Sequence, residues 1–252
     1  METLTVFLTN MGEAARLSGK AFRELFRPPF EWRLTIVQLE QCGIDSWSIT
    51  FLTAIFTGMV MAMQFAIGLE PFGASMYTGK LVALGIVREL GPVLTALLVG
   101  GRVGSGFTAE IGSMNVTEQV DAIRALGADP IRKLVLPRLL AMTIACPLLT
   151  IMADLIGCFG GAIITVFEVD VTFRFVYEQM TETIGIADLM HGIGKSVFFG
   201  FFIALIGCWN GLRTHGGTEG VGIATTQTVV YTSITILVSD FILTRIFLVL
   251  YG

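Results

Sequence analysis

The sequence predicts an all-α protein that crosses a membrane several times. Hydrophobic residues occupy 54% of its 252 positions, charged residues only 14%, and the mean hydropathy is +0.77. A soluble core of this size could not bury so much apolar surface. The apolar residues also gather in runs longer than the roughly 20 residues that a membrane-spanning helix requires. The net charge of -4 is small and the basic residues form no continuous patch, so we expect no nucleic-acid partner.

The first 27 residues predict an amphipathic helix that lies in the membrane interface. Apolar side chains recur on one helical face, and basic side chains recur on another, namely Arg16, Lys20, Arg23 and Arg27. A helix packed on another subunit would show the same pattern. The consecutive prolines of "RPPFEW" end this helix. We therefore expect an interfacial helix and linker over residues 1–45, no cleaved signal peptide, and a five-span domain over residues 46–252.

Five apolar runs predict the membrane-spanning helices, at residues 47–69, 81–111, 134–167, 187–212 and 221–251. Basic residues gather before the first run and between the second and third, whereas the other connections carry few. Loops rich in lysine and arginine stay on the cytoplasmic side of a membrane. The N-terminus is therefore predicted to be cytoplasmic, and the C-terminus to lie on the outer side.

The connection between the second and third runs predicts a short helix over residues 116–127. At its start, Asn115 can cap the helix, with Glu118 three positions later. Asp121 lies near the start of the helix, Arg124 lies near its end, and Gly127 can terminate it. Asp129–Pro130 can then begin the next helix. A solvated loop is the plainer alternative. A helix with its own end signals is better suited to presenting a rigid surface to a partner.

Residues 87–141 resemble the signature region of the MlaE (YrbE) family of permeases. Four blocks match in order: R-E-L-x-P-V at residues 88–93, G-R-x-G at 101–104, A-E-x-G at 109–112, and D-A-I-R-x-L-G-x-D-P at 121–130. The likeness extends over nearly the whole chain. Members of this family are the membrane subunits of ABC systems that move phospholipids between the inner and outer bacterial membranes and so maintain outer-membrane lipid asymmetry.

The resemblance implies a set of partners and a place in the cell. It implies a homodimer in the bacterial inner membrane, two copies of a separate ATPase subunit, a periplasmic ring of MCE-domain proteins and a STAS-domain protein. It also implies that the short helix couples the ATPase to the membrane, through Glu118, Asp121, Arg124, Leu126, Gly127 and Asp129. The "GIGKS" run at residues 192–196 has leucine at position 189, where a phosphate-binding loop needs glycine, so we expect no nucleotide site in this chain.

A lipid-binding surface is predicted on the first span and at the start of the second. Methionine and phenylalanine offer a soft surface for acyl chains, and Gln64 offers a polar amide at membrane depth. Together with the family resemblance, these features select Met61, Gln64, Phe65, Leu69, Phe72, Arg88 and Glu89. The alternatives are ordinary helix packing for the apolar residues and a helix-anchoring polar network for Arg88 and Glu89.

Three further charges inside the spans are predicted to be structural or to take part in gating: Arg102, Glu110 and Asp154. Asp154 is a candidate partner for Arg102. The same charges motivate a rival hypothesis, a proton-driven secondary carrier of a lipid or amphiphile. An intramembrane enzyme is disfavoured, because the two histidines have no triad or metal-ligand spacing; we expect no metal and no cofactor. Glycine pairs four residues apart predict close helix packing within the chain or, alternatively, a dimer contact.

Overall fold

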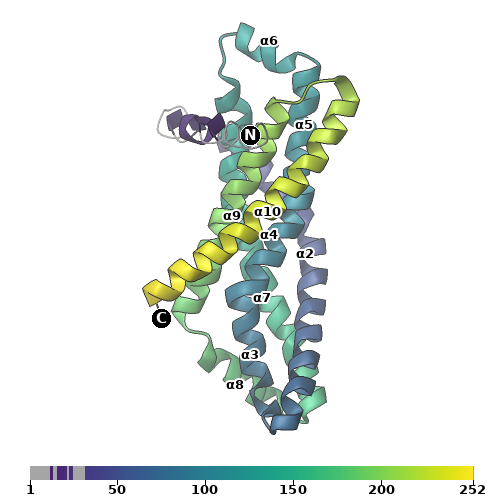
Figure 1. Ribbon diagram of the computed structural model, residues 1–252, viewed down its shortest axis with the longest axis vertical. Helices are drawn as coiled ribbons and strands as arrows, with labels where there is room; N and C mark the ends of the chain where they lie inside the picture. Colours follow the sequence, from purple (N-terminus) through teal and green to yellow (C-terminus); the bar gives the residue numbers. More distant parts are fainter. Residues whose placement is uncertain (1–11, 14–15, 22, 25–31, 252) are drawn as a thin grey trace, which may run out of the picture. The chain divides into compact units, whose positions relative to one another are not determined.

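A computed structural model describes residues 12–13, 16–21, 23–24 and 32–251 (Figure 1). Within this described part the regular structure is entirely helical, as predicted. The predicted interfacial helix over residues 1–27 lies mostly outside it. The long helices are α2 (Trp32–Leu69), α7 (Leu136–Val169), α9 (Ile186–Leu212) and α10 (Gly217–Tyr251). The shorter ones are η1 (Glu70–Phe72), η2 (Ser75–Tyr77), α3 (Thr78–Gly85), η3 (Ile86–Leu90), α4 (Gly91–Val99), η4 (Gly100–Gly104), α5 (Ser105–Val116), α6 (Gln119–Ala125), η5 (Ile131–Val135) and α8 (Phe173–Thr183).

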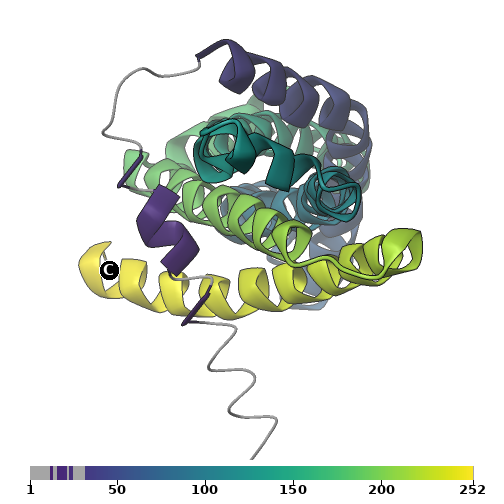
Figure 2. The same cartoon turned by 90° about the horizontal axis from the view of Figure 1, so that it is seen from above.

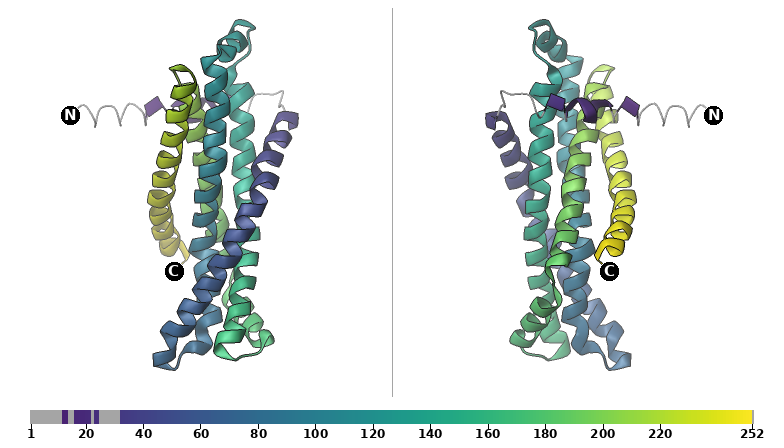
Figure 3. Two further views of the ribbon diagram at one scale, coloured as in Figure 1. Left: turned by 90° about the vertical axis from the view of Figure 1, so that its right-hand side faces the viewer. Right: turned by 90° about the vertical axis from the view of Figure 1, so that its left-hand side faces the viewer.

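Five helical stretches of the described chain are long and apolar enough to cross a membrane, which confirms the predicted fold class. They are Trp32–Phe72, Ser75–Val116, Ile131–Val169, Ile186–Leu212 and Gly217–Val249. The first begins earlier than the predicted span at residues 47–69. Figure 3 shows α2 as one uninterrupted helix, which therefore runs through the predicted boundary at residue 45. Its early turns carry acids but no proline, so nothing in the sequence stops the helix there.

The second stretch is a chain of helical pieces in which α3, α4 and α5 are joined by the π-helical turns η3 and η4. A proline explains the first of these turns. Pro92 has no backbone N–H to offer the carbonyl of Arg88, and its ring clashes with that carbonyl in a regular helix. The backbone widens instead, and the N–H of Gly91 donates to Ile86, five residues earlier. The carbonyl of Arg88 is thereby left for a side chain.

The described residues divide into two compact units. The first unit takes the described residues up to Ile44, then Val99–Ala145 and Phe199–Ile236; the second takes Asp45–Leu98, Cys146–Phe198 and the described residues from Leu237 onward. In the first unit, α6 lies across the ends of α5 and the η5–α7 stretch (Figure 2).

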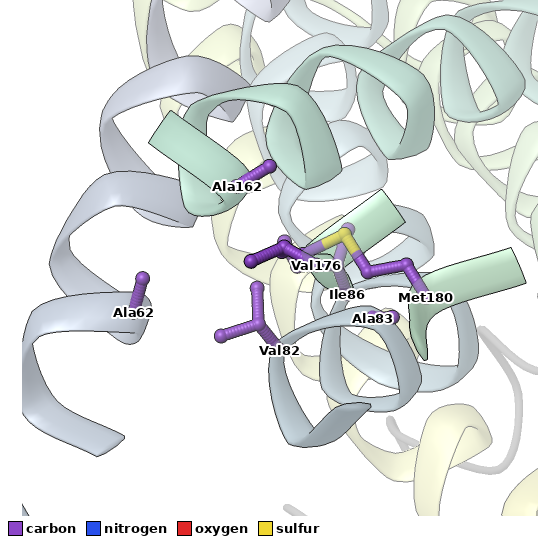
Figure 4. Packing of buried hydrophobic residues seen from close by; sticks show 7 residues of the cluster. All are labelled: Ala62, Val82, Ala83, Ile86, Ala162, Val176 and Met180. Atoms are coloured by element: carbon purple, nitrogen blue, oxygen red, sulfur yellow. The ribbon is translucent and has the colours of Figure 1, made fainter. Parts of the chain in front are cut away.

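The core of the second unit joins α2, α3, α7 and α8. Its buried members are small or branched apolar side chains and one methionine: Ala62, Val82, Ala83, Ile86, Ala162, Val176 and Met180 (Figure 4). Glycines bring α2 and α7 into backbone contact, because a Cβ atom on Gly58 would lie only 1.9 Å from the carbonyl oxygen of Gly157. One predicted glycine pair, Gly157 with Gly161, therefore serves packing within the chain, since a Cβ on Gly161 would lie 2.6 Å from Val82.

The first unit packs α5 against α9 and α10 in a similar way. A Cβ atom on Gly207 would lie 2.7 Å from the carbonyl oxygen of Gly104, and the Oγ1 of Thr108 donates to the carbonyl of Gly207 at 3.0 Å. The same hydroxyl lies 2.7 Å from Thr228 Oγ1, which also accepts from the Asn210 amide at 2.9 Å. A buried hydrogen-bonded seam thus joins the three helices. Here too the glycines serve contacts within the chain.

Candidate functional site

The short helix α6 is smaller than predicted and begins differently. The predicted N-cap, Asn115, is instead part of α5, and its side-chain amide donates to the carbonyl of Thr214 at 2.9 Å. The predicted capping box is therefore wrong, because a tertiary hydrogen bond takes the side chain on which it depends. Glu118 stands at the start of α6 with a left-handed backbone, at φ 60°, and caps no N–H with its side chain.

The other end of α6 follows the sequence prediction. Gly127 has φ 77°, its N–H donates to Arg124, and the N–H of Ala128 donates to Ile123 at 3.1 Å. This pair of bonds is the Schellman motif, which needs glycine at the left-handed position. Asp129 Oδ1 then accepts from the N–H of Ile131 at 2.9 Å and starts the next helical segment, as predicted.

One buried residue fixes α6 to its unit and the rest of its surface is open. Val120 is fully buried, whereas Leu126 is 86% exposed. Asp121 and Arg124 form an exposed ion pair with 2.7 Å between Oδ1 and Nη1. Leu126, Asp121 and Arg124 are therefore accessible on the surface of α6.

A network of charged side chains lies in the second unit, around the π-helical turn η3. Arg88 pairs with Asp188 of α9. The Nζ of Lys195, also on α9, lies 2.5 Å from Glu89 Oε2 and 3.2 Å from the carbonyl oxygen of Arg88, the carbonyl that Pro92 leaves without a backbone donor. We call Arg88, Glu89, Asp188, Lys195 and Asp240 the charge network.

Asp240 of α10 completes the charge network, with its Oδ1 2.9 Å from Lys195 Nζ. Thr244 Oγ1, one turn along α10, lies 3.3 Å from Glu89 Oε1. Lys195 is fully buried, so a single ammonium joins three helical segments at membrane depth.

The sequence selected Arg88 and Glu89 but missed three members of the charge network. Lys195 lies within the false phosphate-binding motif at residues 192–196, and no motif marks Asp188 or Asp240. A usable signal existed, because Asp188 and Lys195 are seven residues apart and share one face of a helix, and Asp240 is a lone acid in an apolar run. The alternative of a helix-anchoring network is the one that these contacts support.

The three remaining predicted charges lie in separate surroundings. Glu110 pairs with Arg138 at 2.8 Å, and the Arg138 side chain, only 5% exposed, also donates to the carbonyl of Leu134. Asp154 is buried, and a Cβ on Gly91 would lie 1.7 Å from its Oδ1. Arg102 belongs to the other unit, at a hollow of about 410 Å³, so its pairing with Asp154 stays a prediction.

The residues predicted to bind lipid divide into two groups. Met61 and Phe65 are partly buried and pack on the core of the second unit, which is the alternative that the sequence left open. Gln64 is exposed and Phe72 is 82% exposed, while Leu69 is half-buried. The outward face of α2 carries a different set of large apolar side chains: Leu52, Phe56, Val60, Met63 and Ile67. Their spacing of four, four, three and four residues places them on one stripe, beside Gln64.

Comparison with known proteins gives a consistent answer. The model of the family described as Permease MlaE matches residues 35–246. A probable ABC transporter permease protein of Rickettsia conorii is 38% identical over 241 residues, which are 96% of this chain and 93% of the relative. The intermembrane phospholipid transport system permease protein MlaE of Haemophilus influenzae is 39% identical over 214 residues, covering 84% of this chain and 82% of the relative.

A plant protein is similar over much the same region. The chloroplastic protein TRIGALACTOSYLDIACYLGLYCEROL 1 of Arabidopsis thaliana is 36% identical over 231 residues, which are 92% of this chain and 66% of that protein. The match to the family model covers nearly the whole helical bundle, including α6 and all five members of the charge network. This multi-pass membrane protein belongs to the MlaE permease family.

Proposed function

We propose that this chain is the membrane-spanning subunit of an ABC transporter that moves phospholipids between the inner and outer membranes of a bacterium. The observation that carries the proposal is the combination of five spanning helices with 39% identity to a relative named for intermembrane phospholipid transport. In such a transporter the chain binds and moves the lipid, and a separate ATPase subunit hydrolyses ATP.

The contact with the ATPase is assigned to α6. Its support is local geometry: Val120 anchors the helix, a glycine-based stop ends it, and Leu126, Asp121 and Arg124 are exposed. A helix with fixed ends moves as a rigid piece, so a displacement of the ATPase passes to α5 and to the η5–α7 stretch on either side. Glu118, Gly127 and Asp129 contribute by shaping the ends of the helix.

The lipid is assigned to the outward face of α2. The stripe of apolar side chains there, which includes Phe56 and Met63, offers a continuous surface for acyl chains, and Gln64 beside it can donate to an ester or phosphate oxygen. Phe72 extends this surface at the end of the helix. Arg88 is half-exposed and already paired with Asp188, so its part is to hold α9 in place while keeping further donors for a phosphate.

The wider assembly is part of the same proposal and rests on the resemblance to the family. Two copies of this chain and two ATPase subunits form the transporter in the inner membrane, with a ring of MCE-domain proteins on the periplasmic side and a STAS-domain protein at the ATPase. The distribution of basic residues supports a cytoplasmic N-terminus and a periplasmic C-terminus.

Native mass spectrometry of the gently isolated complex tests this proposal. We expect two copies of this chain, two ATPase chains and bound phospholipid. Reversing both charges of the exposed pair on α6 (D121R with R124D) should release the ATPase, whereas the same reversal of the exposed pair on α8 (R174E with E178R) should not. A chain isolated without ATPase or phospholipid would contradict the proposal.

The lipid surface has its own test. Gln64→Leu should lower the amount of phospholipid that copurifies with the chain, while Gln41→Leu, the same change at an exposed glutamine of α2 outside the stripe, should leave it unchanged. Equal lipid content in both variants would remove Gln64 from the binding surface without bearing on the ATPase contact.

A further inference from the structure

The hydrogen-bonded seam of the first unit reaches as far as the start of α6. Asn115 is the last residue but one of α5, and its side-chain amide donates to the carbonyl of Thr214, between α9 and α10, at 2.9 Å. Its backbone carbonyl accepts from the N–H of Glu118 at 3.1 Å, and Glu118 accepts the first bond of α6, from Ala122. Asn115 therefore contacts α6 through its backbone and the connection between α9 and α10 through its side chain. Figure 1 shows these parts at the same end of the first unit.

From Thr214 the hydrogen bonds continue along α9, α10 and α5. Thr214 Oγ1 donates to the carbonyl of Asn210 at 3.0 Å, and the Asn210 amide donates to Thr228 Oγ1 at 2.9 Å. Thr228 Oγ1 lies 2.7 Å from Thr108 Oγ1, which lies 3.0 Å from the carbonyl oxygen of Gly207. One placement of the hydroxyl hydrogens satisfies this run, with Thr228 donating to Thr108 and Thr108 donating to Gly207. We call five residues the relay: Asn115, Thr214, Asn210, Thr228 and Thr108.

The relay fixes α5 firmly to α9 and α10. Four of its members are buried, and Asn115 is half-buried. Separating the helices would leave buried hydrogen-bonding groups without partners, which is costly. The chain also packs closely at both ends of the relay: a Cβ atom on Gly112 would lie 3.0 Å from Thr214 Oγ1, and one on Gly207 would lie 2.7 Å from the carbonyl oxygen of Gly104. These parts are therefore built to move together.

Neither α9 nor α10 adjoins α6 in the chain. The helical segments before and after α6 are α5 and η5, so a displacement of α6 reaches α9 and α10 through contacts between side chains. Apolar contacts are non-directional and let one helix slide along another. A hydrogen bond is lost once its two heavy atoms separate beyond about 3.5 Å, so a line of buried hydrogen bonds resists such sliding.

We propose that the relay passes a displacement of α6 to α9 and α10, and that Asn115 is the residue that joins α6 to the relay. This inference rests on the proposed function, because it takes the ATPase to act on α6. It adds α9 and α10 to the parts that move with α6, besides α5 and the η5–α7 stretch. Asn115 is a positioning residue, since it acts through Thr214 and not by touching lipid.

The test measures two rates in the intact complex, reconstituted in vesicles that contain a fluorescent phospholipid: ATP hydrolysis and transfer of that phospholipid. Asn115→Leu removes the amide donor at nearly equal size. It should lower the phospholipid moved per ATP about fivefold or more, while ATPase binding and ATP hydrolysis continue. Asn115→Gln keeps an amide donor and should recover most of this ratio. A wild-type ratio in Asn115→Leu would overturn the proposal.

Thr228→Val tests a buried member of the relay. It should lower the same ratio, whereas Thr143→Val should not, because the Thr143 hydroxyl donates within α7 of the same unit, to the carbonyl of Leu139 at 2.7 Å. The double variant N115L/T228V should be no worse than the more affected single variant, because both changes interrupt one path. Effects that multiply in the double variant would mean two independent defects and would overturn a single relay.

Amide hydrogen exchange gives a readout that does not depend on lipid transfer. Trapping the complex with bound ATP should change the exchange of α6 and of residues 213–216, between α9 and α10. In Asn115→Leu the change at α6 should remain, and the change at residues 213–216 should be lost. An equal change at residues 213–216 in both proteins, or none there in the wild type, would overturn the proposal.

Failure of the relay is distinguishable from failure of the proposed function. A wild-type complex that holds no ATPase subunit, or that moves no phospholipid, would contradict the function itself. A wild-type complex that moves phospholipid, with the same phospholipid moved per ATP in Asn115→Leu, would leave the function standing and remove the relay.

Discussion

Replacing Lys195 by methionine should strongly destabilise the second unit. The Lys195 ammonium is fully buried and lies 2.5 Å from Glu89, 2.9 Å from Asp240 and 3.2 Å from the carbonyl oxygen of Arg88. Methionine has a similar length and retains the apolar packing of the side chain, but it removes the charge. Two carboxylates and one carbonyl then lose their common partner.

The magnitude follows from the burial of the residues that remain. Removing one partner of a buried ion pair costs about 3 to 5 kcal/mol. The side chains of Glu89 and Asp240 are 38% and 21% exposed, and Thr244 stays near Glu89, so water and a hydroxyl compensate in part. We therefore expect about 3 kcal/mol, which in a protein of this size lowers the thermal unfolding midpoint by about 6 to 12 °C.

The assay is thermal unfolding of the purified chain in detergent, with Lys80→Met as the control. Lys80 is an exposed lysine of the same unit, and its replacement should change the free energy of unfolding by about 0.5 kcal/mol or less. A Lys195→Met midpoint equal to that of Lys80→Met would refute the reasoning. The triple variant E89Q/K195M/D240N should recover much of the loss, because it leaves no uncompensated charge; a triple variant as unstable as Lys195→Met would assign the loss to packing.

Two further predictions concern glycines and backbone conformation. Gly91→Ala should lower the thermal unfolding midpoint, because its Cβ would lie 1.7 Å from Asp154 Oδ1. Adding Asp154→Ala should restore part of the lost midpoint. Gly106→Ala is the control and should leave the midpoint unchanged, because its Cβ would have no atom within 4 Å. In α6, Gly127→Ala should destabilise the helix by about 1 kcal/mol and Glu118→Gly should stabilise it by a similar amount, because both positions have positive φ. Amide hydrogen exchange across α6 measures both changes, and an unchanged exchange rate in Gly127→Ala would contradict this account.

The spanning helices were predictable because membrane depth imposes a signal along the chain itself. A run of apolar residues must be helical in lipid, whatever its neighbours are. The start of α2 was less visible, because Glu40 and Asp45 suggest a connection outside the bilayer although neither residue interrupts a helix. The π-helical turn at η3 could have been inferred from Pro92, whose missing N–H frees the carbonyl of Arg88.

Pairings between helices were not predictable from one sequence. Residue spacing shows which side chains share a helix face, so it relates Asp188 to Lys195, but it does not say that Glu89 and Asp240 meet the same ammonium from two other helices. The error at Asn115 has the same origin. Local rules assigned its amide to a capping box, and the contact with Thr214 on a distant loop took it instead.

The paired charges also bear on the rival idea of a proton-driven carrier. An acid that carries protons becomes neutral in each cycle, and while it is neutral it cannot compensate the positive charge of a partner. Glu89 holds the fully buried Lys195, and Glu110 holds Arg138, whose side chain is 5% exposed. Loss of Glu89 would leave the buried Lys195 with Asp240 as its one described carboxylate, and loss of Glu110 would leave the buried Arg138 guanidinium without its carboxylate; both changes are costly. Charges arranged in this way are suited to fixing helices together, which favours the proposal that energy for movement enters through a contact between α6 and a separate ATPase.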